Sequence, residues 1–340
     1  MLALKRIGLV LAVGFVLFLV VGFLLPRQVH VERSVAIDAP PTTVFALLGG
    51  FRMFHRWSPW HGLDPNLRYT YSGPDFGAGA TIEWAGDPKT VGSGRQEIVE
   101  ARSPDRILFA LYFGPDGRAT GEYTLSAEGD DTRVTWGFDT DLGVNPLGRY
   151  FGLMMDGMVG KDFEKGLASL KILAEGLPKH DFASLAVERV EVEPATVAYV
   201  TARSGKDEQE IARTIGGAYG QVMQFMSQHA VKQAGPPITI NRERSDAGYE
   251  FDAAIPIDRV PDEEIPADSP VQVKQTYAGT TLKVVHRGPY RNMQDTYLGL
   301  EAWMAAHGFE AGGPPWDEYV TDPGNTAEAD LVTHVFMPVK

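Results

Sequence analysis

The feature that most restricts the fold of this 340-residue chain is an internal repeat in its C-terminal half. The segment Tyr219–Pro237 aligns with Tyr297–Pro315 without a gap, at an offset of 78 residues and with six identities in nineteen positions. Both copies end in Gly-Pro-Pro and share a tyrosine, a methionine and a histidine. Neighbouring copies of one supersecondary unit bury their apolar faces together. The repeat therefore predicts one domain with two similar halves.

Strand patterns flank both copies of the repeat. Alternating apolar residues at 194–202 and 280–287 precede the copies, and apolar stretches interrupted by proline follow them. We expect two strand-helix-strand-strand halves, over about 189–258 and 271–340, related by a pseudo-twofold axis within one sheet. Both helices would then cover one face of the sheet, with a cleft where the halves meet.

A different pattern predicts another domain over residues 29–177. It opens with a half-buried strand at 29–37, continues through a short helix, and ends in a long helix that Asn145 caps and Gly176 terminates. Between these helices lie six alternating runs separated by glycine, proline and aspartate, at 66–72, 78–85, 90–101, 105–113, 118–128 and 131–140. This order predicts a helix-grip α+β domain, in which a curved antiparallel sheet wraps the last helix. Residues 178–188 are the predicted linker.

The N-terminal residues 1–28 contain a long apolar segment that belongs to neither predicted domain. Nineteen residues from Ile7 to Leu25 carry no charge, which is enough helix to cross a bilayer. Lys5 and Arg6 precede them, so the positive-inside rule predicts a cytoplasmic N-terminus and a body on the outer, periplasmic or extracellular side. A cleaved signal peptide is the alternative, but Pro26 and Arg27 follow the apolar run without a small-residue cleavage site. We expect an uncleaved anchor across residues 7–25.

Charge and composition exclude several kinds of partner. The formal charge is −13, from 31 basic and 44 acidic residues, and it becomes −16 once the three basic residues before position 30 are set aside. Such an acidic body repels phosphate backbones, so nucleic acid is not an expected partner. The chain has no cysteine, and neither His229 nor His307 has a partner at ligand spacing. Neither a metal nor another cofactor is expected.

Three fragments of the first domain resemble the SRPBCC superfamily, which includes START-like and polyketide-cyclase-like proteins. They are VERSVAIDAPPTTVFALL, FHRWSPW and NPLGRYFGLMMDGMVGKDFEKGLASLKILAE. This resemblance implies an apolar cavity for a lipid, a hormone-like or a polyketide-like molecule. His55, Trp57, Trp60 and His61 would lie near the mouth of that cavity, as a gate or as ordinary packing.

The repeated domain resembles the GyrI-like, or multidrug-regulator effector-binding, family. VVHRGPY at 284–290, LEAWMAAHG at 300–308, GGPPWDEYVTDP at 312–323 and the closing FMPV carry the likeness. The resemblance implies a cleft with an acidic residue for lipophilic, often cationic or aromatic, molecules. Some stand-alone members resemble hydrolases of reactive cyclopropane-bearing compounds. The regulators carry a separate DNA-binding domain, which this sequence lacks.

Four residues are the predicted ligand contacts. The family's acidic residue falls on Glu318 by motif position, and Tyr319 matches the tyrosine that follows it. Alternation places Trp316 beside Glu318, and Asp317 beside Tyr319 on the other face. Tyr290 follows a strand-to-helix turn that faces the cleft. An exposed acidic strand residue among core aromatics is the structural alternative.

Residues matched in both halves are interpreted as scaffold. Tyr219 and Tyr297 recur in both helices, and His229 and His307 lie at the two helix ends, where an imidazole can satisfy free carbonyls. A feature present in both halves more often supports the duplicated fold than a single site.

The leading hypothesis is a membrane-anchored protein with two apolar ligand cavities, which senses, carries or sequesters lipophilic or cationic aromatic compounds. One alternative is a hydrolase of reactive lipophilic xenobiotics, in which Glu318 is catalytic and Tyr290 or Tyr319 orients it. Another is a lipid chaperone whose second domain docks a partner protein.

Overall fold

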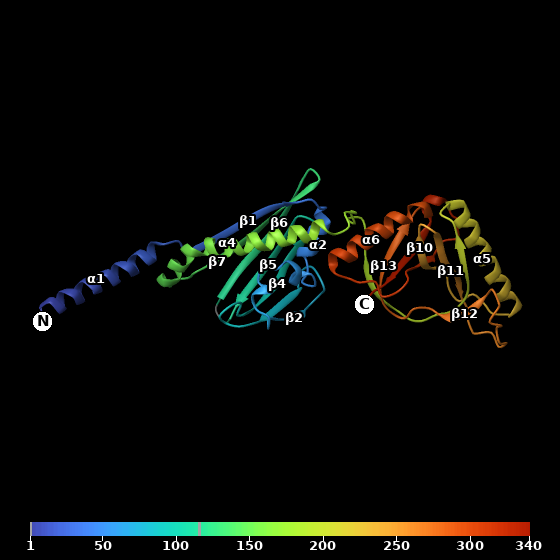
Figure 1. Cartoon of the computed structure of the whole chain (residues 1–340), viewed down its shortest axis with the longest axis horizontal. Helices are drawn as coiled ribbons and strands as arrows, with labels where there is room; N and C mark the ends of the chain where they lie inside the picture. Colours follow the sequence, from blue (N-terminus) through green and yellow to red (C-terminus); the bar gives the residue numbers. More distant parts are fainter. Residues whose placement is uncertain (1, 115–116) are drawn as a thin grey trace. The chain divides into compact units, whose positions relative to one another are not determined.

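The computed structural model describes residues 2–114 and 117–340 (Figure 1). It divides the chain into two compact units: the first ends at Phe182, and the second begins at Ala183 and includes Lys340. Each unit contains its own antiparallel sheet, with helices packed on it. The predicted α+β class is confirmed.

Helix α1 (Leu2–Leu24) opens the first unit and is apolar on all sides. Within the described residues, Arg6–Leu24 is the one helical segment long and apolar enough to cross a membrane, and almost none of its surface is buried. A water-soluble protein rarely exposes so large an apolar surface. A signal sequence passes the same test of length and composition, so the helix by itself fits both an anchor and a signal sequence.

The sheet of the first unit is an antiparallel meander with one long-range pairing. In the described residues its seven strands follow the order β1-β7-β6-β5-β4-β3-β2, so the first strand pairs with the last. The predicted strand runs are confirmed to within a few residues, as β1 (Gln28–Ile37), β2 (Arg68–Ser72), β3 (Thr81–Ala85), β4 (Ser93–Arg102), β5 (Arg106–Phe113), β6 (Gly117–Glu128) and β7 (Asp131–Asp141).

Helix α4 (Pro146–Glu175) packs along this sheet, mainly against β1. The side chain of Asn145 accepts a hydrogen bond from the amide of Leu147 at 3.0 Å, which confirms the predicted N-cap. Short helices α2 (Pro41–Leu48) and α3 (Phe54–Trp57) and a 3-10 turn at His61–Leu63 complete the unit. Their buried faces join the sheet and α4 in one hydrophobic core.

The sheet of the second unit has a symmetric strand order. In the described residues its eight strands run β12-β9-β11-β10-β14-β15-β13-β8, and every neighbouring pair is antiparallel. The strands are β8 (Glu188–Val192), β9 (Thr196–Ser204), β10 (Ile238–Ser245), β11 (Gly248–Pro256), β12 (Gln272–Gln275), β13 (Gly279–Arg287), β14 (Trp316–Tyr319) and β15 (Val332–Pro338). Strands β10 and β14, which directly follow the two sequence repeats, pair with each other in the middle of the sheet.

Two helices carry the repeated segments, α5 (Glu208–Gln228) and α6 (Met293–His307). Short 3-10 turns at Tyr290–Asn292 and Glu328–Asp330 precede α6 and β15. His229 caps α5, and His307 is the last residue of α6, as predicted for helix-end histidines. Each edge strand joins the other half, because β8 precedes β9 in sequence but pairs with β13, and β12 precedes β13 but pairs with β9.

Candidate functional site

Strand β14 carries three of the four residues predicted to contact ligand, and it divides them between two faces. Successive side chains of a strand point to opposite faces. Trp316 and Glu318 therefore lie on one face of the sheet, and Asp317 and Tyr319 lie on the other. The four predicted residues do not line one surface.

Tyr319 lies on the face that the helices cover. Its ring meets the ring of Tyr219 from α5 edge to face, with centroids 6.4 Å apart. The ring of Tyr290 also meets Tyr319 edge to face, at 5.5 Å. The hydroxyl of Tyr319 donates to Thr239 Oγ1 of β10 at 3.1 Å. The structure thus brings Tyr290 and Tyr319 together over the middle of the sheet.

The opposite face holds Trp316 and Glu318. The Trp316 ring stacks on Phe336 at 4.9 Å, with an angle of 8° between the ring planes. Glu318 Oε1 lies 2.9 Å from Nδ1 of His334, its register partner in β15. Both members of this pair are partly exposed. Glu318 therefore already has a hydrogen-bond partner in His334.

Asp317 is the buried acid of the helix-covered face, with only 5% of its surface exposed. Its Oδ1 accepts a hydrogen bond of 2.6 Å from the hydroxyl of Tyr297, and its Oδ2 accepts one of 3.2 Å from the Asn241 amide. The hydroxyl of Tyr249 donates in turn to the Asn241 carbonyl oxygen. In the part of the chain that the structure describes, no lysine or arginine forms an ion pair with Asp317.

Burial changes the protonation of this site. It raises the pKa of Asp317 from 3.8 to about 6, although the hydrogen bonds from Tyr297 and Asn241 and the positive charge of Arg244 oppose the shift. Burial and the nearby Asp317 carboxyl raise the pKa of Tyr297 and of Tyr319 well above the usual value. The tyrosines therefore keep their protons near neutral pH, while Asp317 ionises without a directly paired cation among the described residues, and Arg244 acts on it only through space.

The structure places two further residues in this cluster that the sequence does not predict as ligand contacts. Motif position favours Glu318 over Asp317, and Tyr297 is interpreted as scaffold because it recurs in both halves. Strand alternation was the signal that could have found Asp317, since it shares a face with Tyr319. Tyr219 does have the predicted structural contact, because its hydroxyl donates to the backbone carbonyl of Ile238 at 2.7 Å.

A groove of about 720 Å³ lies beside β10, β11 and β12. Its charged side chains are paired with each other: Asp252 accepts from Lys274 Nζ at 2.5 Å, and Arg242 Nε lies 3.0 Å from Glu250. The carboxyl of Asp252 is completely buried within these contacts. The groove therefore has fewer free charges than its composition suggests, and Asp317 is the stronger candidate for binding a charged ligand.

The interior of the first unit is aromatic. The Trp136 ring stacks on Phe163 of α4 at 4.0 Å, and Trp57 meets Trp136 edge to face at 5.7 Å. Phe109 and Tyr123 lie beside them, with centroids 4.8 Å apart. These rings occupy the space between the sheet and α4 where the sequence predicts a ligand cavity.

Two polar atoms in this interior lack hydrogen-bond partners. Trp57 Nε1 and the Tyr123 hydroxyl are buried without a partner within bonding geometry in the described residues. Burial raises the pKa of Tyr123, and a polar interaction with the Gln96 side chain, which lies outside hydrogen-bond geometry, opposes that shift. Buried polar groups are nearly always paired. Both groups can donate, so they suit an acceptor oxygen of a ligand or of water.

The other residues near the predicted cavity mouth lie further out. The Trp60 indole donates to Asp162 of α4 at 3.3 Å, and its ring packs against Trp136. His55 and His61 are exposed, and the His61 ring stacks on Tyr69. Trp57 and Trp60 thus have the packing role that was one of the two expectations.

Comparison with known families gives two matches, and each match covers one of the two sheets. Residues 28–175 match the family described as polyketide cyclase/dehydrase and lipid transport, and residues 186–340 match the GyrI-like small molecule binding domain. No curated protein matches the chain at a significant level. Both matched families are small-molecule- or lipid-binding domains.

Three solved structures are distant likenesses of parts of this chain. EcmrR in a complex with DNA is 17% identical over 46% of this chain, and the match spans 57% of the EcmrR chain, with a TM-score of 0.41. A hydrolase from Listeria innocua is 17% identical over 48% of this chain and 94% of its own, with a TM-score of 0.33. The Aha1 dimer from Colwellia psychrerythraea is 16% identical over 44% of this chain and 97% of its own, with a TM-score of 0.32.

Proposed function

We propose that this chain, which joins a polyketide cyclase/SRPBCC domain to a GyrI-like small-molecule binding domain, is a membrane-anchored binding protein for lipophilic small molecules. The GyrI-like domain binds a lipophilic cation, and the SRPBCC domain binds an apolar molecule with an acceptor oxygen. Sensing, carriage and sequestration are the roles that such binding serves.

The observation that carries this proposal is that the buried Asp317 carboxyl forms no direct ion pair with a cation in the described residues. An ionised carboxylate in an apolar site is costly unless a cation accompanies it. The rings of Tyr290, Tyr319 and Tyr219 form a series of edge-to-face contacts on the same face of the sheet. Tyrosine faces attract cations by about 0.5 to 2 kcal/mol, more when water is excluded. A delocalised aromatic cation satisfies both the charge and the rings.

Calorimetric titration of the full-length protein in lipid nanodiscs tests this function. We expect the tetraphenylphosphonium cation to bind at least about tenfold more tightly than the neutral triphenylphosphine oxide, because only the cation interacts favourably with ionised Asp317. Equal affinity for the two compounds would show that the domain selects for shape and not for charge.

Two buried donors without partners in bonding geometry, Trp57 Nε1 and the Tyr123 hydroxyl, support the second binding role, that of the SRPBCC domain. Tyr123→Phe removes a buried hydroxyl whose interaction with Gln96 falls outside hydrogen-bond geometry, so the ligand-free protein should gain about 1 kcal/mol in free energy of unfolding. Tyr219→Phe is the matched control, because that hydroxyl donates to Ile238, and its loss should cost about 1 kcal/mol. Denaturant titration measures both, and destabilisation by Tyr123→Phe would mean that the hydroxyl is already paired.

Anchoring is proposed from the length and exposure of α1. We expect protein extracted from membranes to have the mass of the complete chain, because the residues after Leu25 lack a small-residue cleavage site. Mass spectrometry of the detergent-extracted protein measures this. A mass that lacks the first 25 or so residues would identify a signal peptide instead.

Hydrolysis is a second candidate function, favoured by the contact of Glu318 with His334. A carboxylate held by an imidazole at 2.9 Å can act as a general base toward water. Replacing Glu318 by Gln would remove this base and leave Asp317 unchanged.

A further inference from the structure

Helix α4 has an apolar face that the described residues of the first unit leave about half exposed. Leu147, Phe151, Met154 and Met158 recur at helical spacing, and each is between 46% and 56% exposed. We call these four residues the outer stripe. Soluble proteins rarely align several large apolar side chains on one exposed helix face.

A change of phase in the sequence separates the outer stripe from the buried part of α4. In the series of large apolar residues along α4, Phe163 follows Met158 after a step of five residues, which turns the helix by about 140°. Phe163, Leu167 and Leu170 are buried against the sheet. Because the apolar residues of the second half of α4 pack on the sheet, the outer stripe of the first half points away from the sheet.

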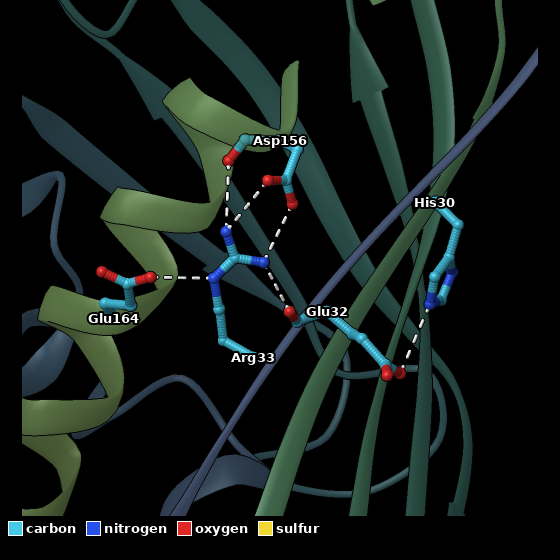
Figure 2. Close-up of polar contacts among 5 residues, drawn as sticks. All are labelled: His30, Glu32, Arg33, Asp156 and Glu164. Atoms are coloured by element: carbon cyan, nitrogen blue, oxygen red, sulfur yellow. Dashed lines mark hydrogen bonds and ion pairs between the residues drawn. The ribbon is translucent and has the colours of Figure 1, made fainter. Parts of the chain in front are cut away.

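Arg33 of β1 fixes this orientation (Figure 2). Its Nη1 donates to Asp156 at 2.9 Å and its Nε donates to Glu164 at 2.8 Å, and these two residues lie on the side of α4 away from the outer stripe. A Cβ at Gly160 would lie 2.1 Å from the Arg33 guanidinium, so only glycine at this position lets the Arg33 side chain lie against the surface of α4. The ion pairs hold the polar side of α4 against β1.

The first turn of α4 contacts the last turns of α1. Arg149 Nη1 donates to the backbone carbonyls of Phe23 at 2.6 Å and Leu25 at 3.2 Å. The Tyr150 hydroxyl donates to the carbonyl of Phe18 at 2.7 Å, and the Tyr150 and Phe18 rings stack at 4.2 Å. The outer stripe thus begins beside the part of α1 where the apolar helix ends.

The chemistry of the helix changes along the same face. Lys161 and Lys165 follow Met158 at three- and seven-residue spacing, and both are exposed. Apolar side chains followed by lysines match the order of acyl chains and phosphate headgroups in a bilayer. An apolar surface of another protein would match the outer stripe but would not account for the two lysines that follow it.

We propose that the outer stripe of α4 inserts into the lipid interface of the membrane that α1 spans, with Lys161 and Lys165 at the headgroups. The proposal rests on the membrane anchor of the proposed function. It adds a second membrane contact, made by the SRPBCC domain itself, which brings one end of its long helix into contact with lipid. Lipophilic ligands dissolved in the bilayer would then meet this domain without crossing water.

The absence of cysteine allows a direct test on the full chain. Single variants Met154→Cys, Leu147→Cys, Ile172→Cys and Val13→Cys are labelled with bimane and reconstituted in phosphatidylcholine bilayers with or without doxyl-labelled lipid. Ile172 is the matched control, because it is exposed on the same helix about 27 Å from Met154. Doxyl lipid should reduce the fluorescence at Met154 and Leu147 by about twofold and leave Ile172 nearly unchanged.

The outcomes separate this proposal from the anchor. Quenching at Val13 without quenching at Met154 and Leu147 would overturn the lipid contact and leave the anchor intact. No quenching at Val13 would overturn the anchor, and the lipid contact with it. Shielding of Met154 from aqueous iodide without quenching by doxyl lipid would mean that protein covers the outer stripe, which also overturns the proposal.

Discussion

Asp317→Asn is expected to weaken tetraphenylphosphonium binding by at least about 30-fold near neutral pH, which is about 2 kcal/mol. The reason is that the ionised carboxyl of Asp317 forms no direct ion pair in the described residues and interacts with Arg244 only through space, so the ligand supplies the paired cation. Asparagine keeps the size of the side chain and can still accept the hydrogen bond from Tyr297. Calorimetric titration of the full chain in nanodiscs measures the change.

Glu318→Gln is the matched control, one residue away on the opposite face of the same strand. Because Glu318 contacts His334, its neutralisation should change the cation affinity by less than about threefold. If Glu318→Gln lost the affinity and Asp317→Asn kept it, the acid chosen by motif position would be the binding residue. Equal small losses in both variants would exclude a carboxylate-based site on β14.

The same variant should change how stability depends on pH. The pKa of Asp317 is about 6 in the folded protein and 3.8 ordinarily, so the folded state binds the proton more tightly. The contribution of Asp317 to stability is therefore greatest below its ordinary pKa and falls as the pH rises to about 6, by a total of about 3 kcal/mol. Asp317→Asn should remove this fall, and an unchanged pH profile of unfolding would contradict the raised pKa.

Phe163→Ala is expected to lower the free energy of unfolding of the first domain by about 3 to 5 kcal/mol. Phe163 is buried in the aromatic interior, where its ring stacks on Trp136 at 4.0 Å. Removal of the ring leaves a cavity between α4 and the sheet. Denaturant titration followed by tryptophan fluorescence, on detergent-solubilised full-length protein, measures the loss.

Phe151→Ala on the same helix is the control. Phe151 belongs to the exposed outer stripe, so its truncation should change the free energy of unfolding by less than about 0.5 kcal/mol in detergent. Similar losses for both variants would contradict the separation of α4 into a buried and an exposed apolar face.

Most of the fold could be predicted from local patterns. Turn residues separated the strands of the first meander, and Asn145 and Gly176 marked both ends of α4. The sequence repeat located α5 and α6. The exchange of β8 and β12 between halves could not be predicted, because both strands are short and pair with distant residues.

The candidate site was harder to predict, because it depends on which face of a strand packs under the helices. Alternation correctly separated Asp317 from Glu318, but alternation cannot say which of the two faces is buried. The contact of Tyr297 with Asp317 supplies that information. The exposed face of α4 could not be predicted for a similar reason. The five-residue step after Met158 shows that the apolar face changes, but the sequence does not say which of the two faces packs on the sheet.

Proton release on ligand binding tests the central claim most directly. Tetraphenylphosphonium is titrated calorimetrically at about pH 5.5 in two buffers of different ionisation enthalpy, where about three quarters of the Asp317 carboxyls carry a proton. If the cation binds over Asp317, the native protein should release about 0.7 proton per ligand, and Asp317→Asn should release none. Binding by the native protein without proton release would contradict the account.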